Sequence, residues 1–143
     1  MRSWKREPTI LLVAVLLTSA AGCDDLLDDT QELPDFARYE LTGTSPVDLE
    51  VITSTNFQVI NDFELQQTFV TFTLSDTVVT TPPLSGDVDI RSNDRFFIRV
   101  TNYSDSVADV RLLVSFDGVT EYDQSALMSA GASLEFSQIF SGT

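Results

Sequence analysis

The side chains that could carry covalent or acid–base chemistry are few in this chain. Cys23 is the only cysteine, Lys5 is the only lysine, and histidine is absent. The residue that most often serves as a general base or as a transition-metal ligand is therefore missing. A serine or threonine nucleophile needs an adjacent base, and the chain has neither a Gly-x-Ser-x-Gly elbow nor a glycine-rich phosphate loop. The composition predicts a protein that is not an enzyme and that holds no cofactor or metal.

Paired carboxylates are the one enzymatic route that the sequence leaves open. Asp48 and Glu50 would share one strand face. Asp87 and Asp89 would share another. Two carboxylates at a suitable separation can hydrolyse a glycoside. Acids that alternate with apolar residues are also typical of the solvent-facing side of a sheet, and we favour that interpretation.

Cys23 follows a segment that has the features of an export signal. Lys5 and Arg6 precede an apolar run over residues 10–17, and small residues come next. A charged start, a short apolar run and small residues before a cleavage point are typical of a secretory signal peptide. The run is much shorter than the roughly 20 apolar residues that a membrane-spanning helix needs. An ordinary secretion signal and an uncleaved anchor are the alternatives.

Ala20, Ala21, Gly22 and Cys23 together resemble the bacterial lipobox, although Ala20 stands where leucine is commoner. The resemblance implies cleavage after Gly22, attachment of diacylglycerol to the Cys23 sulfur, and a further acyl chain such as palmitate on the new amino group. Two or more chains give stable membrane attachment. The predicted location is the bacterial cell envelope, with the domain in the periplasm or outside the membrane. Asp24 resembles the residue that retains lipoproteins in the inner membrane of enterobacteria.

The charge balance narrows the classes of partner. The formal net charge is −14, and only five arginines follow the predicted signal peptide. Nucleic-acid binding and electrostatic docking on anionic lipid both require clustered Lys and Arg, so the sequence argues against them. We interpret the acidity as a solubility feature. Binding of cations or of a basic partner is the alternative.

Residues 23–37 are rich in aspartate, and Pro34 ends any helix ahead of it. We interpret this segment as a flexible, solvated tether. A calcium site is the alternative, although the aspartates lack the spacing and the turn glycine of an EF-hand loop. The predicted organisation is a lipoprotein signal peptide at 1–22, the lipidated cysteine and acidic tether at 23–37, and one domain at 38–143.

The domain shows the period-two alternation of β-strands, with turn residues every eight to twelve positions. Asp117-Gly118 lies between two strand-like runs and predicts a hairpin with a type I′ turn. The pattern favours an all-β fold, an antiparallel sandwich of about seven to eight strands. Alternation predicts that twelve apolar residues point between the two sheets: Leu41, Leu49, Val51, Phe72, Ile90, Phe96, Ile98, Val100, Leu112, Val114, Phe116 and Phe136. Thr71 and Thr73 should face outward.

Two segments of the domain resemble the MmpS family of small mycobacterial membrane proteins. Residues 39–44 read Tyr-Glu-Leu-Thr-Gly-Thr and are followed by an alternating strand at 47–51. Residues 110–119 are similar to the family's late strand pair with its Asp-Gly turn. The resemblance implies an immunoglobulin-like sandwich held at a membrane, with an accessory role beside an RND-type exporter. This chain departs from the family in having a lipobox and in lacking the cysteine pair.

Four residues suggest an interaction surface. Phe97 should lie opposite the core-facing Phe96 and Ile98, on the side of Arg99, and Leu113 should share a face with Arg111. Exposed aromatics beside arginine are common in binding surfaces. The alternative is that these strands are buried on both faces. The predicted function is that of a non-enzymatic envelope lipoprotein that binds an envelope protein, and the family resemblance implies a role as an accessory to a transport complex. The alternative is a carrier of small hydrophobic ligands or lipids.

Overall fold

The computed structural model describes residues 33–140, and these residues form one all-β unit. Within this range there are eight strands and no helix, so the all-β prediction is confirmed. The strands are β1 (Phe36–Thr44), β2 (Leu49–Asp62), β3 (Gln67–Thr80), β4 (Leu84–Asp89), β5 (Arg95–Thr101), β6 (Ala108–Phe116), β7 (Val119–Met128) and β8 (Ser133–Ile139).

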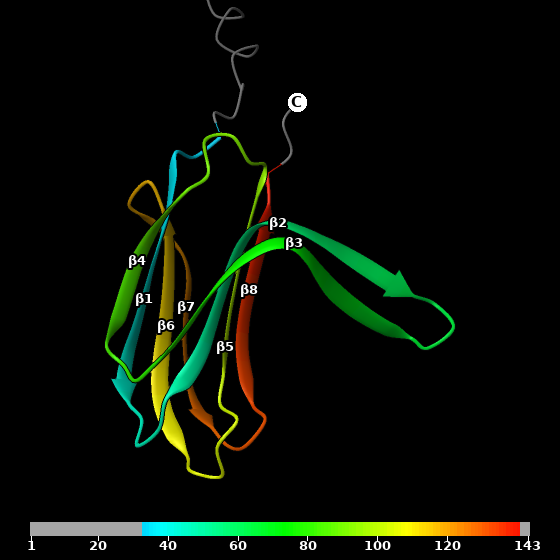
Figure 1. Ribbon diagram of the computed structural model, residues 1–143. Helices are drawn as coiled ribbons and strands as arrows, with labels where there is room; N and C mark the ends of the chain where they lie inside the picture. Colours follow the sequence, from blue (N-terminus) through cyan, green and yellow to red (C-terminus); the bar gives the residue numbers. More distant parts are fainter. Residues whose placement is uncertain (1–32, 141–143) are drawn as a thin grey trace, which may run out of the picture. The chain divides into compact units, whose positions relative to one another are not determined.

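The strands form two four-stranded antiparallel sheets, which confirms the predicted sandwich. One sheet has the order β4-β1-β6-β7 and the other has the order β3-β2-β5-β8 (Figure 1). Successive strands β1 and β2 lie in different sheets, as do β5 and β6. The Asp117-Gly118 turn joins β6 to β7, and both residues have positive φ, as a type I′ turn requires.

The core lies between the two sheets and is built from the alternate residues that the sequence predicts. Ten of the twelve predicted residues belong to the buried cluster, and Phe136 packs against it while partly exposed. Sequence reasoning missed some smaller or peripheral members: Ala37, Tyr39, Ala108, Val110 and Met128. Alternation predicts these positions correctly because the central strand pairs have no register shift. These pairs are β1 with β6 in one sheet, and β5 with β2 and β8 in the other.

Phe72 is the exception, and its predicted place between the sheets is wrong. The register of β2 against β3 shifts twice, between Thr53 and Asn56 and again between Asn56 and Phe57. A β-bulge bends the strand and changes which face the following side chains occupy. Phe72 therefore packs against Phe97, on the outer side of the sheet, with ring centroids 4.9 Å apart.

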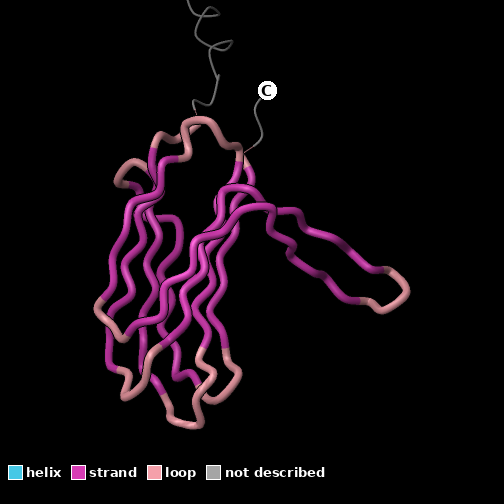
Figure 2. Tube along the Cα trace, viewed as in Figure 1, coloured by secondary structure: helices cyan, strands magenta, loops and turns pink. Residues whose placement is uncertain are grey.

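Beyond these bulges β2 and β3 continue as a two-stranded hairpin, which we call the arm (residues 56–74). β2 pairs with β5 only as far as Ser54, and from Asn56 onward it pairs with β3 alone. Figures 1 and 2 show the arm extending away from the sandwich. At its tip the Asp62 carboxylate accepts hydrogen bonds of 3.0 Å from the backbone N–H groups of Glu64 and Leu65. This Asx-type turn holds the tip in a defined shape.

Candidate functional site

The predicted lipidation site lies outside the described residues. This applies to the lipobox residues Ala20, Ala21 and Gly22, to Cys23, and to the sorting residue Asp24. They stay predictions from the sequence. In the part of the chain that the structure describes, no helix is long and apolar enough to cross a membrane.

The four residues of the predicted interaction surface do not form one surface. Phe97 and Arg99 lie on β5, whereas Arg111 and Leu113 lie on β6 in the other sheet. Because their neighbours in each strand fill the shared core, both pairs point outward, and they do so from opposite layers of the sandwich. The structure therefore separates the two pairs rather than bringing them together.

Phe97 has no exposed surface, as the alternative interpretation of this strand predicts. The two aromatic residues at the base of the arm cover it: Phe57 lies 5.6 Å and Phe72 lies 4.9 Å from it, measured between ring centroids. The Arg99 guanidinium lies 6.0 Å from the rings of Phe72 and Phe97. Phe97 therefore fixes the arm to the sandwich instead of offering a contact to a partner.

The outer face around Leu113 is polar. Arg111 donates two hydrogen bonds, of 2.6 and 2.5 Å, to the carboxylate of Asp123 on the neighbouring strand. This bidentate pairing lowers the pKa of Asp123, chiefly through the hydrogen bonds from Arg111. Leu113 is half-buried beside this pair. Because Arg111 and Asp123 pair with each other, Arg111 links β6 to β7 through a cross-strand ion pair.

The arm is an exposed apolar surface that the sequence interpretation did not identify. Phe63, at the tip, is 88% exposed, and Leu65 is 62% exposed. Along the strands Ile60 pairs with Phe69 on one face of the hairpin, and Val59 pairs with Val70 on the other. The exposed apolar side chains of the arm are Val59, Ile60, Phe63, Leu65, Phe69 and Leu74.

The arm is also nearly free of charge, in a protein that is strongly acidic. Its only charged residues are Asp62 and Glu64, and both are at the tip. The cores of protein–protein interfaces are depleted of charge and enriched in aromatic residues. The signal in the sequence was the composition of residues 56–74, which holds four phenylalanines and no lysine, arginine or proline.

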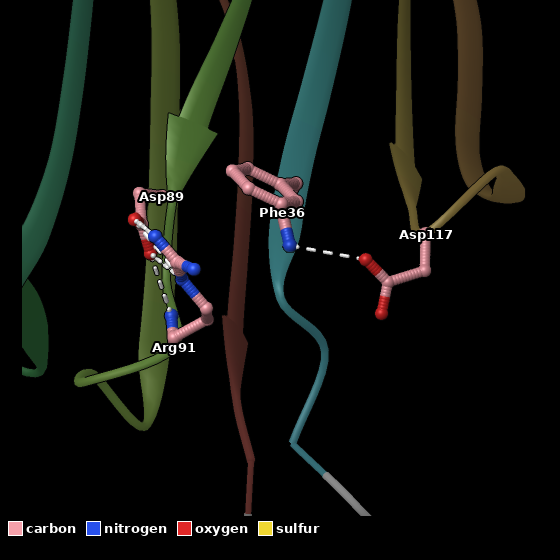
Figure 3. A network of polar contacts seen from close by, with 4 residues as sticks. All are labelled: Phe36, Asp89, Arg91 and Asp117. Atoms are coloured by element: carbon pink, nitrogen blue, oxygen red, sulfur yellow. Dashed lines mark hydrogen bonds and ion pairs between the residues drawn. The ribbon is translucent and has the colours of Figure 1, made fainter.

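A polar network holds the start of β1 at one end of the sandwich (Figure 3). The Asp117 carboxylate accepts hydrogen bonds of 3.0 Å from the backbone N–H groups of Asp35 and Phe36. The Arg91 guanidinium lies 5.3 Å from the centre of the Phe36 ring and pairs with the Asp89 carboxylate. These contacts hold Asp35 and Phe36, the end of the segment that the sequence assigns to the tether, against the turn between β6 and β7.

Three of the four candidate carboxylates, Asp87, Asp89 and Glu50, make surface contacts. Hydrogen bonds from Arg91 lower the pKa of Asp89, whereas a general acid needs a raised value. Asp87 lies 3.9 Å from the Arg38 guanidinium. Glu50 accepts a hydrogen bond of 3.2 Å from the Tyr103 hydroxyl. These contacts fit the interpretation of the acids as a solvent-facing sheet surface.

Two recesses on the described surface are open to solvent. One, of about 330 Å³, lies beside the arm tip and is lined by residues such as Asp62, Phe63 and Gln66. The other, of about 520 Å³, lies between the arm base and the loop from β4 to β5 and includes Arg91 and Arg95. No group of three or more His, Cys, Asp or Glu side chains that could hold a metal ion occurs among residues 33–140.

The fold and the exposed arm define the class of this protein, an antiparallel β-sandwich that carries a projecting apolar hairpin. Comparison of the chain with family models, with curated proteins and with solved structures gives no match.

Proposed function

We propose that this protein is a non-enzymatic lipoprotein of the bacterial cell envelope, anchored through Cys23, whose sandwich domain binds another envelope protein through the arm. The observation that carries the proposal is the exposure of apolar side chains at the tip and on both faces of the arm. Contiguous exposed apolar surface is typical of binding sites. The sandwich supplies a rigid base, because Phe57, Phe72 and Phe97 lock the arm to β5.

The tip indicates the chemistry of the partner. Phe63 and Leu65 project from a turn that is flanked by Asp62 and Glu64. A matching surface would bury the two apolar side chains in a groove and place basic groups at its rim, because complementary charges orient an encounter and exclude wrong partners. A component of a membrane transport complex is the kind of partner that the resemblance to the MmpS family suggests.

The alternative function, a carrier of hydrophobic ligands or lipids, would use an enclosed apolar cavity. The two recesses described above are open, and polar residues such as Asn61, Gln66 and Asn93 contribute to their walls. The arm offers apolar surface without enclosure, which suits a protein partner better than a small ligand. We therefore place protein binding ahead of ligand transport.

Replacing both Phe63 and Leu65 with serine should abolish capture of the partner. The two side chains are the most exposed apolar groups of the tip, so the change removes contact area while the core stays intact. The measurement is chemical cross-linking in intact membranes, followed by affinity capture of the tagged lipoprotein and mass spectrometry. We expect cross-linked species that depend on these two residues.

Leu127→Ser is the matched control for the tip variant. Leu127 is also strongly exposed, at 73%, but it lies on β7, far along the chain and in the other sheet. It should leave the cross-linked species unchanged. If the tip variant captures the same partners as the wild type, the arm is not the contact.

Changing Cys23 to serine should release the domain from membranes or leave an uncleaved precursor. The thiol is the group that would carry diacylglycerol, and a serine hydroxyl does not replace it in this processing. Membrane fractionation with immunoblotting checks both the location and the length of the product. A mature-length Cys23→Ser protein that still sediments with membranes would rule out the lipid anchor.

Asp24→Ser is the control for this experiment, because it changes the neighbouring residue and keeps the thiol. It should stay attached to membranes at mature length. Density-gradient separation of inner and outer membranes then tests the sorting role separately. An unchanged distribution would assign Asp24 to the acidic tether alone.

A further inference from the structure

The four outer strands of the two sheets differ in how well their open edges are protected. Exposed strand edges are templates for pairing with another chain, and proteins usually shield them with charges, prolines or short lengths. β4 has six residues and carries Asp87 and Asp89, and Pro82-Pro83 precedes it. β7 carries Glu121 and Asp123, and β8 has seven residues and carries Glu135.

β3 lacks these protections. It is 14 residues long, its only charged residue is Asp76, and it contains no proline or lysine. Within the arm, residues 67–74 carry no charge at all. Among the described residues, no strand pairs with the outer edge of β3. A two-stranded hairpin alone is marginally stable in water, so the arm would gain stability from additional strands.

The backbone groups at this open edge can be assigned from one contact. Arg95 Nη1 donates a 2.8 Å hydrogen bond to the Phe57 carbonyl, so this carbonyl points away from β3. In an antiparallel ladder, the N–H and C=O groups of one residue point to the same side, and residues directly opposite share this property. Two residues beyond Phe57 along β2, Val59 lies directly opposite Val70 of β3. Val70 therefore directs its N–H away from β2, toward the open edge of β3, and Val59 directs its N–H toward the other edge of the arm.

We propose that the open edge of β3 within the arm pairs with the same edge of a second copy of this chain. The two copies of residues 67–74 would run antiparallel about a two-fold axis, and the joined arms would form a four-stranded ribbon. A contact of this kind is self-complementary, as a two-fold interface requires. The negative charges oppose association least here, because the edge is uncharged and the acidic tips of the two arms lie at opposite ends of the ribbon.

The edge of β3 is a better site than the edge of β2 within the arm. At the arm base, on the β2 edge, the Phe57 carbonyl already accepts a hydrogen bond from the Arg95 side chain and is not free to pair with another strand. The same side chain lies over the Phe57 ring, at 5.9 Å from its centroid, and so covers the start of that edge. On the β3 side the open edge continues past the arm to Thr80.

The test is the mass of the full-length processed lipoprotein in detergent, measured by light scattering with correction for bound detergent. The wild type should have twice the mass of one chain. Val70→Pro removes an N–H at the β3 edge and should give a monomer, while the internal ladder of the arm is kept. Val59→Pro is the matched control, because it changes the same side chain on the opposite edge, and it should stay dimeric.

A monomeric wild type would overturn the proposal. So would a monomeric Val59→Pro variant beside a dimeric Val70→Pro variant, or the loss of the dimer in both. If Val70→Pro melts at a lower temperature than the wild type, Thr68→Lys provides a second probe of the β3 edge, with Asn61→Lys as its cross-strand control. The Phe63/Leu65 double serine variant should still dimerise, so failure of self-pairing and failure of partner capture are distinguishable.

Discussion

Replacing Phe116 with alanine is expected to lower the free energy of unfolding by about 3–5 kcal/mol, the usual cost of removing a large aromatic side chain from a packed core. Phe116 is 7% exposed and is surrounded by three other rings. The ring centroids lie 5.9 Å away for Phe96, 6.2 Å for Phe136 and 5.0 Å for Phe140. The cavity would therefore open where both sheets and the end of the chain meet.

This loss is large beside the roughly 5–15 kcal/mol that stabilises a domain of this size. The single cysteine means that no disulfide within the chain can hold the sheets together. Denaturant unfolding followed by fluorescence or circular dichroism measures the change, and the slope of the transition should stay the same. Thr71→Ala is the control, because Thr71 is exposed on the arm, and its effect should be within about 0.5 kcal/mol. Equal losses for the two variants would mean that the strand faces are assigned wrongly.

The core could be predicted from sequence because alternation in a regular strand has only two outcomes, inward or outward. In β5, Phe96, Ile98 and Val100 fill the core because their register stays unbroken from end to end. In β2 and β3 the two bulges break this rule. The sequence alternates in the same way on either side of the bulges, so alternation alone predicts the wrong face for Phe72.

The candidate surface could not be predicted for a different reason. Local patterns show that Phe97 and Leu113 face away from the core, but they do not show to which layer each strand belongs. β5 and β6 are consecutive in sequence and lie in different sheets, so their outer faces point apart. The burial of Phe97 depends on Phe57 and Phe72, which are brought to it by long-range pairing and by the bend of the arm.

The exposure of the arm is likewise a tertiary property. Alternation over residues 69–74 predicts a half-buried strand, with Phe72 facing inward and Thr71 and Thr73 facing outward. In the fold these residues extend beyond the last pairing with β5, so only one neighbouring strand covers them. A partner, or a second copy of the chain, would cover the apolar strand residues that the sheet leaves exposed.

Gly43→Ala should be the most damaging change of a glycine in this domain. Gly43 lies within β1, opposite Val110, and has a φ of 113°, a conformation that side chains rarely adopt. A Cβ atom there would overlap the Asp109 carbonyl oxygen and would lie 2.9 Å from the Val110 Cα atom. Both atoms belong to the backbone of β6, a central strand, and they could move only by distorting the sheet. Backbone strain and overpacking together should cost about 2–6 kcal/mol.

Gly131→Ala separates the two contributions to this loss. Gly131 also has a positive φ, of 75°, but a Cβ atom at this turn would meet nothing within 4 Å. Its variant should lose only the conformational part, about 1–2 kcal/mol. Thermal and denaturant unfolding of the two alanine variants beside the wild type gives the comparison. Gly43→Ala should be clearly less stable than Gly131→Ala. Similar losses of stability in the two variants would mean that conformational strain alone acts and that β6 does not crowd Gly43.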